Sequence, residues 1–294
     1  MPSPELDAVL GLLRKHPFRL DAGADELRAG LDRLGKAFAP PEGVARDGMT
    51  LGGVPAERLS AGNGPAVLYL HGGGYAVGSP QSHRHLAGLL ARDAGGTVWL
   101  LDYRRAPECP FPAALDDAMA AYRDLEARLA PRTPAIAGDS AGGGLTFALA
   151  VRARDEGLPA PSALVAISPW VNLGTESESY DLLAPFDPLT SRDIAAYFAE
   201  RYLAGRSARE PLASPLFARL DGLPRTLIQV ADRECFLGDV VAMHQRLVAA
   251  GVESELSVWK EMFHVWHLYW PMLPEGKSAV AEIARFLAAR DRHA

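Results

Sequence analysis

The segment AIAGDSAGGG, residues 135–144, decides the fold, because it reads as a β-strand that turns abruptly into a helix. Within it, residues 138–142 satisfy the pattern G-x-S-x-G, with Ser140 at its centre. Small residues on both sides allow a sharp turn that lifts the serine hydroxyl above a sheet edge, beside free N–H groups at the start of the helix. An isolated motif of this kind is also compatible with a glycine-rich turn in which Ser140 only caps the helix. The strand before it and the helix after it favour a nucleophile.

Short apolar runs and longer helical patterns alternate on both sides of this segment. The strand candidates are AVLYL at 66–70, TVWLL at 97–101, AIAGD at 135–139, ALVAIS at 163–168, TLIQVA at 226–231 and ELSVW at 255–259. Apolar spacing predicts helices over 81–93, 112–130, 141–157, 238–251 and 277–290. This alternation predicts a mostly parallel central sheet flanked by helices, an α/β fold whose ligands bind beyond the carboxyl ends of the strands.

Two segments fall outside the alternation. Residues 1–42 hold one or two amphipathic helices before any strand, and residues 172–211 separate two strands by more chain than a crossover needs. Within the second segment, IAAYFAERYL at 194–203 has helical spacing, which favours an ordered lid over a loose loop. We therefore expect a catalytic core of residues 43–171 and 212–294, with N-terminal cap helices at 1–42 and a cap insertion at 172–211.

Composition predicts a soluble globular protein and argues against several classes of partner. The 294 residues are 48% hydrophobic and 22% charged, enough to bury a core without disulfides or a structural metal. The net charge is −6 without a clustered basic stripe, no apolar run reaches membrane-spanning length, and the N-terminus has the wrong charge order for a signal peptide. Cys109 and Cys235 form no C-x-x-C pair. We expect a cytoplasmic protein that binds neither nucleic acid nor membrane.

A serine nucleophile needs an oxyanion hole, and a candidate directly follows the strand at 66–70. The sequence HGGGY at 71–75 has three glycines, whose N–H groups can turn toward an oxyanion without obstruction by a Cβ atom. A phosphate-binding loop is the other interpretation of such a stretch. The patterns G-x-x-x-x-G-K-[ST] and G-x-G-x-x-G are absent here, so the oxyanion hole is favoured.

The nucleophile also needs a base, and the order of the fold places that histidine last. His264 follows the strand at 255–259 by a short turn, which brings it to the same sheet edge as the serine. Of the other late histidines, His267 reads as a neighbour or core residue, His244 falls within a helix and His293 lies at the terminus. No histidine pair matches the zinc spacing H-E-x-x-H, so we expect no metal site.

Several segments together resemble the hormone-sensitive-lipase-like family of α/β-hydrolases, the bacterial esterases marked by H-G-G-G and G-D-S-A-G-G. They are HGGGYAVGS at 71–79, DYRRAPECPFPAAL at 102–115, GDSAGGGL at 138–145, ISPW at 167–170, LASPLFARLDGLP at 212–224 and MFHVW at 262–266. The resemblance implies the α/β-hydrolase fold with a small helical cap and a carboxylester hydrolase without cofactor. It also implies that the backbone N–H groups of Gly73, Gly74 and Ala141 form the oxyanion hole.

The triad acid is expected in the loop ADRECFLGD at 231–239, which departs from the family pattern. Relatives usually carry D-P-L-x-D or S-D-E-V-L-L-D there, whereas this chain has Arg233 where an aspartate is expected. When the loop is laid against that pattern, Glu234 occupies the place of the acid. Asp232 remains the alternative, and Asp239 is expected to start or lie inside the next helix.

Two further positions carry smaller expectations. Asp139 is expected to orient the serine turn through local hydrogen bonds and to point away from the imidazole. Phe263 stands where the family commonly has proline before its histidine, which alters only a turn.

The expected reaction is hydrolysis of short- to medium-chain acyl esters through an acyl-enzyme, since no amphipathic element suited to lipid surfaces stands out. Tyr75 is expected to bind substrate, and Tyr197, Phe198 and Tyr202 are candidates to line the pocket, although such aromatic stripes are more often core.

Two other functions remain open. An amide or acetyl-group deacylase of a small metabolite would use the same residues. A catalytically silent small-molecule-binding relative of the fold is the other, against which the presence of His264 argues. The unpaired edge of the last strand would suit a homodimer.

Overall fold

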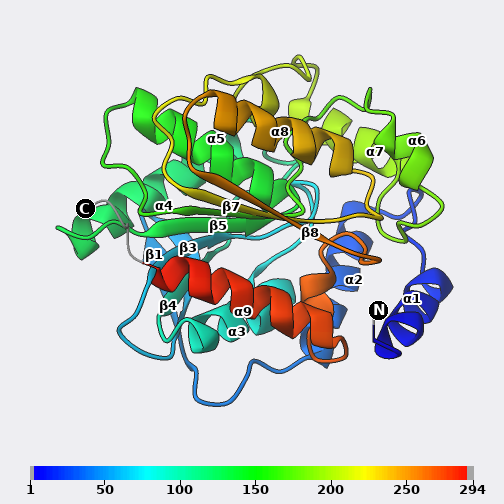
Figure 1. The fold of residues 1–294 in the computed structure, drawn as a ribbon, viewed down its shortest axis with the longest axis horizontal. Coiled ribbons are helices and arrows are strands. Elements are labelled where there is room, and N and C mark those ends of the chain that lie inside the picture. The colour runs from blue at the N-terminus through cyan, green and yellow to red at the C-terminus, as the bar shows by residue number, and fades with distance from the viewer. Residues whose placement is uncertain (1–2, 290–294) are drawn as a thin grey trace.

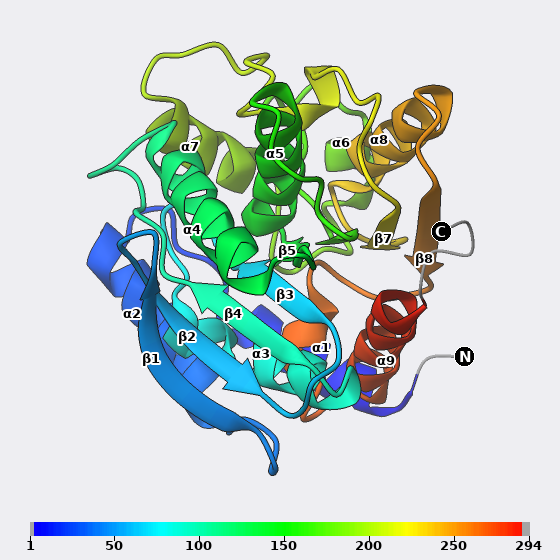
Figure 2. The ribbon, with the colours of Figure 1, turned by 90° about the vertical axis from the view of Figure 1, so that its left-hand side faces the viewer.

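The computed structural model describes residues 3–289. The outermost residues of the predicted 1–42 and 212–294 segments, the end of the predicted helix at 277–290, and His293 lie outside that range. The described chain forms an eight-stranded sheet with the order β1-β2-β4-β3-β5-β6-β7-β8, covered by helices on both faces (Figures 1 and 2). The predicted α/β architecture with a mostly parallel sheet is confirmed.

The strands from β3 to β8 run parallel and make up most of the sheet. They are β3 (Ala66–Leu70), β4 (Thr97–Leu101), β5 (Ala135–Asp139), β6 (Leu164–Ile167), β7 (Thr226–Ala231) and β8 (Ser254–Trp259). All six predicted strands are therefore present, and four of them have the predicted bounds. These segments are easy to recognise because strands buried on both faces have nearly continuous apolar sequences.

Helices cover the two faces of the sheet and enclose two separate cores (Figure 1). One face is covered by α3 (Pro80–Asp93) and α9 (Pro274–Ala288), and the other by α4 (Ala113–Leu129), α5 (Ala141–Asp155) and α8 (Leu237–Ala249). Strand residues alternate between the two cores, so that Leu68 and Leu70 of β3 enter one while Val67 and Tyr69 enter the other. Because both faces are packed, the carboxyl edge of the sheet is left to form the site.

The hairpin of β1 (Ala45–Leu51) and β2 (Val54–Ser60) was not anticipated from the sequence. It adds antiparallel strands to the sheet edge beside β4. Most β1 residues are exposed, so the strand lacks the apolar alternation that would reveal it. Its turn is formed by Gly52 and Gly53, both at positive φ, and a Gly-Gly pair is a hairpin signal in its own right.

The segments predicted to form a cap are helical. The N-terminal segment forms α1 (Glu5–Lys15) and α2 (Ala24–Ala37), and the insertion forms α6 (Ser179–Leu183) and α7 (Arg192–Leu203). These four helices gather at one end of the sheet, on the right of Figure 1. Two short 3₁₀ turns, η1 (Pro215–Phe217) and η2 (Trp266–Tyr269), complete the described helices.

Helix α2 is held against the loop after β3 mainly through Arg28. Its guanidinium donates to the carbonyl oxygens of Ala76 at 2.9 Å and Ala106 at 3.0 Å, and it pairs with Glu108 at 2.6 Å. Asp32, one turn later, accepts a hydrogen bond from Ser79 at 2.5 Å. Helix α2 therefore contacts the glycine-rich loop directly.

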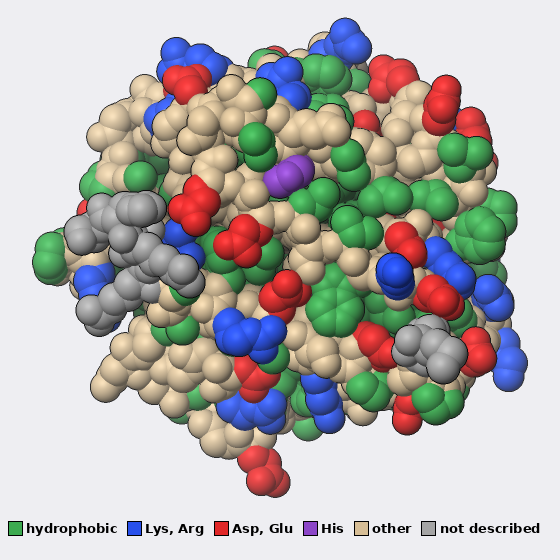
Figure 3. Space-filling model, in the orientation of Figure 1, with side chains coloured by type: hydrophobic (Ala, Val, Ile, Leu, Met, Phe, Trp, Pro, Cys, Tyr) green, Lys and Arg blue, Asp and Glu red, His purple; other side chains and the backbone are tan. Residues whose placement is uncertain are grey.

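The surface carries charges of both signs. On the face in Figure 3, basic and acidic side chains are interspersed among apolar ones. Exposed pairs such as Arg58 with Asp47, 3.3 Å apart, contribute little to stability because water screens them. No helix within residues 3–289 is long and apolar enough to cross a membrane.

Candidate active site

Ser140 lies between the end of β5 and the start of α5, in a strained backbone conformation with φ 52° and ψ −120°. Glycines make this turn feasible. A Cβ atom at Gly142 would overlap the carbonyl oxygen of Leu70, and one at Gly138 would overlap the Gly142 carbonyl. Strain of this kind persists only where the surrounding structure enforces it, and it is concentrated at functional sites. The turn leaves Ser140 half-buried at the carboxyl edge of the sheet.

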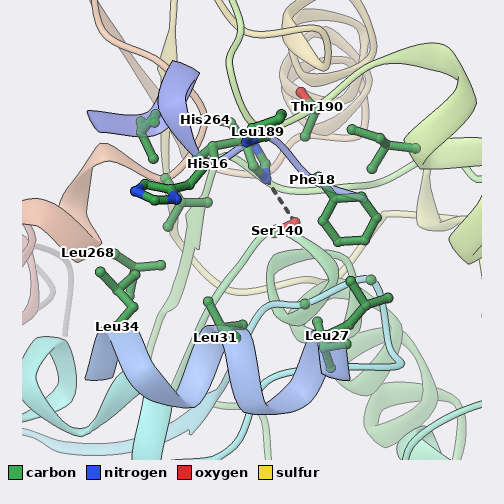
Figure 4. A pocket seen from close by; sticks show the side chains of 18 of the residues that line it. His16, Phe18, Leu27, Leu31, Leu34, Ser140, Leu189, Thr190, His264 and Leu268 are labelled. Carbon is green, nitrogen blue, oxygen red and sulfur yellow. Dashed lines mark hydrogen bonds between the residues drawn. The ribbon is translucent and has the colours of Figure 1, made fainter. Parts of the chain in front are cut away.

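The imidazole of His264 faces Ser140, with 2.9 Å between Nε2 and Oγ (Figure 4). His264 is 5% exposed and sits in the loop after β8, where the next residue, Val265, has a φ of 49°. The ring of Phe236 meets the imidazole edge-on, with 4.9 Å between ring centroids. The structure therefore brings together the serine and histidine that the sequence suggested, although 124 residues separate them.

Glu234 lies on the other side of His264, with its Oε2 atom 3.7 Å from Nδ1. Its side chain is fully buried in the loop after β7. Burial raises the pKa of Glu234, while His264 and the Ser168 hydroxyl act in the opposite direction. For His264, burial is the largest single influence and lowers its pKa, but the nearby Glu234 carboxylate, with smaller contributions from other buried carboxylates, outweighs it. The pKa of His264 is therefore raised.

The two other carboxylates of this loop are engaged elsewhere. Asp232 accepts a hydrogen bond from the N–H of Glu261 at 2.6 Å and so organises the turn after β8. Asp239 lies inside α8, as expected, and accepts a hydrogen bond from the Asn172 amide at 3.2 Å. Burial raises the pKa of Asp239 to about 6. Of the three carboxylates in this loop, the one that lies beside the His264 imidazole is therefore Glu234, 3.7 Å from Nδ1.

The glycine-rich loop after β3 closes over the serine turn. Gly73 and Gly74 have φ values of 115° and 58°, and a Cβ atom at Gly74 would overlap the ring of Phe198. The N–H groups of Gly73 and Gly74 make no hydrogen bond within the described residues. Ala141 is the first residue of α5, so its N–H has no acceptor inside the helix. Three N–H groups are thus free to bind an oxygen atom.

Asp139, the last residue of β5, binds this loop through hydrogen bonds. Its Oδ1 atom accepts hydrogen bonds from the Tyr69 hydroxyl at 2.9 Å and from the Gly72 N–H at 3.1 Å, and Oδ2 lies 3.2 Å from His83 Nε2. Burial alone would raise the pKa of Asp139, but His83 and Tyr69 reverse the shift and lower it. These contacts join the serine turn to the glycine-rich loop, but their partners lie 56 to 70 positions away in the sequence, so the expected local hydrogen bonds are not the ones that the structure shows.

The structure places the Tyr75 side chain in the core instead of on the pocket wall. Tyr75 is 1% exposed, and its ring stacks on Tyr202 with 3.7 Å between centroids. Neither ring is among the residues that line the cavity, whereas Phe198 is. Both rings carry a large apolar area, and stacking them beneath the cap buries more of it than exposure to a cavity would.

Phe263 and Arg233, the two departures from the family pattern, fill structural roles. Phe263 is 1% exposed and packs edge-on against Tyr269 with 5.5 Å between centroids. Arg233 pairs with Glu261 at 3.2 Å. Among residues 3–289, no group of three or more His, Cys, Asp or Glu is arranged to hold a metal ion.

A cavity of about 700 Å³ opens above Ser140 and His264, between the sheet edge and the cap. Leu27, Leu31 and Leu34 project into it from one face of α2, as Figure 4 shows, and Phe18 approaches from the α1–α2 connection. These residues were not singled out from the sequence. Their i, i+4, i+7 spacing is the signal that one face of α2 is apolar, but the same spacing describes an ordinary core face.

Comparison with known proteins shows the family to which the chain belongs. A family model described as the alpha/beta hydrolase fold matches residues 67–268. An acetyl-hydrolase of Streptomyces hygroscopicus is 44% identical over 290 residues, covering 98% of this chain and 97% of that protein. An esterase of Acinetobacter venetianus is 31% identical over 289 residues, covering 97% and 95%.

Solved structures are similar over the whole chain. An esterase from the bacterial hormone-sensitive lipase family superimposes with a TM-score of 0.94 at 42% identity, covering 98% of each chain. The esterase EstE5, in crystals soaked with p-nitrophenyl butyrate, gives a TM-score of 0.93 at 40% identity, covering 97% of this chain and 98% of that one.

Proposed function

This chain belongs to the α/β-hydrolase family and is a serine carboxylesterase similar to the bacterial hormone-sensitive-lipase esterases; from this premise we propose that Ser140, His264 and Glu234 are its nucleophile, base and triad acid. The observation that carries the proposal is the 2.9 Å contact between His264 Nε2 and Ser140 Oγ at a strained strand-to-helix turn. Glu234, which is buried behind the imidazole, is the third member of the arrangement. A base held by an acid and aimed at a serine is the geometry of nucleophilic catalysis.

In the proposed cycle, His264 removes the proton of Ser140 as the hydroxyl attacks the ester carbonyl. The N–H groups of Gly73, Gly74 and Ala141 bind the oxyanion that develops, and those of the two glycines are available because no hydrogen bond within the described chain occupies them. His264 then gives its proton to the departing alcohol. Water repeats the sequence on the acyl-enzyme and releases the acid.

The pH dependence of the reaction should reflect the environment of His264. An imidazole works as a base only when neutral, and the pKa of His264 is raised from 6.5 by the carboxylates around it. We expect kcat/KM to fall about tenfold per pH unit below a midpoint that lies above pH 6.5. The measurement is kcat/KM for a short-chain ester from pH 4 to 9 in a pH-stat, and a midpoint below pH 6.5 would contradict the prediction.

We propose that residues 1–42 and 172–211 act as a cap that defines the substrate pocket. The support is the cavity lining, to which α2 contributes leucines and α7 contributes Phe198. A largely apolar cavity of about 700 Å³ suits a small ester. The substrates proposed are therefore short- to medium-chain acyl esters.

This substrate class predicts a rise and then a fall in rate with acyl length. Burying each additional CH₂ group is worth about 0.8 kcal/mol, so kcat/KM should rise by up to about fourfold per carbon until the pocket is full. We expect p-nitrophenyl esters to peak between butyrate and octanoate and palmitate to be slower than butyrate. The measurement is kcat/KM across the even-numbered acids below the critical micelle concentration. Faster turnover of palmitate than of butyrate would remove the proposal.

Removal of an acetyl group from a small metabolite is the second candidate function. The observation that favours it is the similarity to the acetyl-hydrolase of Streptomyces hygroscopicus over nearly the whole chain. Amide and ester hydrolysis pass through the same tetrahedral intermediate, so the catalytic residues do not distinguish them. The test compares the hydrolysis rates of an acetate ester and of the acetamide in which nitrogen replaces the ester oxygen. The ratio of these rates separates ester hydrolysis from amide hydrolysis.

Two finer points belong to the proposal. Strand β8 forms the sheet edge, with Val258 46% exposed, and is the surface proposed for a homodimer.

Cys109 and Cys235 are both free thiols, in keeping with the proposed cytoplasmic location.

A further inference from the structure

Ser168 lies just beyond the end of β6, between the loop that carries Glu234 and the loop that carries His264. Its side chain is completely buried. The hydroxyl donates a hydrogen bond to Glu234 Oε2 at 2.7 Å, and the same oxygen accepts one from the N–H of Val265 at 3.2 Å. One hydroxyl therefore links the acid to the backbone directly after the base.

The Glu234 carboxylate depends on this contact for its orientation. Its Oε1 atom is buried without a hydrogen-bond partner among the described residues. Its Oε2 atom is 3.7 Å from His264 Nδ1, which is longer than an N–H···O hydrogen bond. The Ser168 hydroxyl thus makes the shortest polar contact that the structure gives this carboxylate. Loss of this hydrogen bond would be costly, because a buried carboxylate without hydrogen-bond partners is strongly destabilised.

Both residues joined by the hydrogen bond between the Val265 N–H and the Ser168 hydroxyl have strained backbones, which indicates that the surrounding structure enforces this contact. Ser168 has a φ of 44° and Val265 a φ of 49°, in the left-handed region that side chains rarely adopt. For a β-branched residue such as Val265 this conformation is an outlier. The Ser168 N–H is fixed by the Gln229 carbonyl of β7 at 2.7 Å, so strands β6 and β7 anchor the serine on which Val265 depends.

We propose that Ser168 is a positioning residue for ester hydrolysis, whose hydroxyl aims the Glu234 carboxylate at His264 and holds the backbone that carries the imidazole. The inference rests on the proposed triad. It predicts that loss of the hydroxyl weakens the base without disturbing the substrate pocket, because Ser168 is not among the residues that line the cavity. We therefore expect kcat to fall while KM changes little.

Two substitutions in the full chain separate the hydroxyl from the backbone strain. Ser168→Ala keeps a side chain at positive φ, whereas Ser168→Gly removes the steric cost of that conformation. Both should lower kcat about 10- to 100-fold, as expected for a hydrogen bond to a charged group, with KM within about threefold of wild type. Their melting temperatures should differ from each other while their kcat values agree. Ser278→Ala, at an exposed serine of α9, is the control expected to match wild type.

A spectroscopic measurement reports the acid–base contact independently of stability. The proton on His264 Nδ1 should give a ¹H resonance that is protected from exchange with water in the wild type, assigned by its absence in His264→Ala. In both Ser168 variants this resonance should move upfield or disappear through exchange with water. Wild-type kcat and an unmoved resonance in both variants would overturn the inference, as would kcat values that follow the melting temperatures. A wild-type chain that turns over no ester would instead overturn the proposed function.

Discussion

Replacing Ser140 by alanine should lower kcat for a short-chain ester by about 10⁶-fold, because the nucleophile that forms the acyl-enzyme is lost. The free oxyanion-hole N–H groups and the cavity remain, so the residual rate should still exceed the uncatalysed one. The cavity that Ser140 faces is otherwise unchanged, and substrate binding should be retained. The measurement is single-turnover and steady-state hydrolysis of p-nitrophenyl butyrate.

Covalent labelling tests the same residue by a second route. A fluorophosphonate should add one adduct to the wild-type chain, located at Ser140 by peptide mass, and none to Ser140→Ala. The Ser278→Ala variant should label like wild type, since that serine is exposed on α9. An adduct on any other serine, or turnover by Ser140→Ala within tenfold of wild type, would show that the nucleophile lies elsewhere.

Replacing Glu234 by glutamine should lower kcat by about 10⁴-fold, since an amide in place of the acid favours the wrong imidazole tautomer and does not stabilise the imidazolium. Glu234 is fully buried with its Oε2 atom 3.7 Å from His264 Nδ1, so solvent does not substitute for it. Glutamine has nearly the same shape and can still accept the Ser168 hydrogen bond, so the fold should survive. The measurement is the pre-steady-state acylation rate in a variant whose melting temperature has been recorded.

The matched control is Asp232→Asn, two residues away in the same loop. The asparagine oxygen can still accept the hydrogen bond that Asp232 receives from the Glu261 N–H. We therefore expect acylation within about threefold of wild type. A near-native Glu234→Gln together with an inactive Asp232→Asn would reverse the assignment of the acid.

The elements of the fold that sequence analysis recovered are those whose sequence pattern follows from burial. The strands at 66–70, 97–101, 135–139 and 226–231 have the predicted bounds because each is mostly apolar and is followed by a polar or glycine-rich turn. Helix α7 was recognised by its spacing within the long insertion. The β1–β2 hairpin was missed because an exposed edge strand has no reason to be apolar.

In the candidate site, too, the residues that sequence analysis recovered are those that stand in a local sequence pattern. Ser140 and His264 stand in local patterns that their chemistry requires, a glycine-flanked turn and a histidine shortly after a strand, so both were found without coordinates. Tyr75 shows the limit of that reasoning. Its ring stacks on Tyr202 of α7 and does not line the cavity, whereas Phe198 of the same helix does. The direction in which a side chain points from an irregular loop depends on what packs against it.

The sequence by itself determined the chain order of the six parallel strands and of the helices between them, and it singled out the serine turn, the glycine-rich loop and His264, because each of these has a signal in its neighbours along the chain. Only the tertiary structure decided that Glu234, rather than Asp232, pairs with His264, that Ser168 bridges their loops, and that one face of α2 lines the cavity. These features join residues tens to more than a hundred positions apart. Their pairing is set by sheet order, which brings the ends of β5, β6, β7 and β8 to one edge, and by burial, which leaves each polar group few partners.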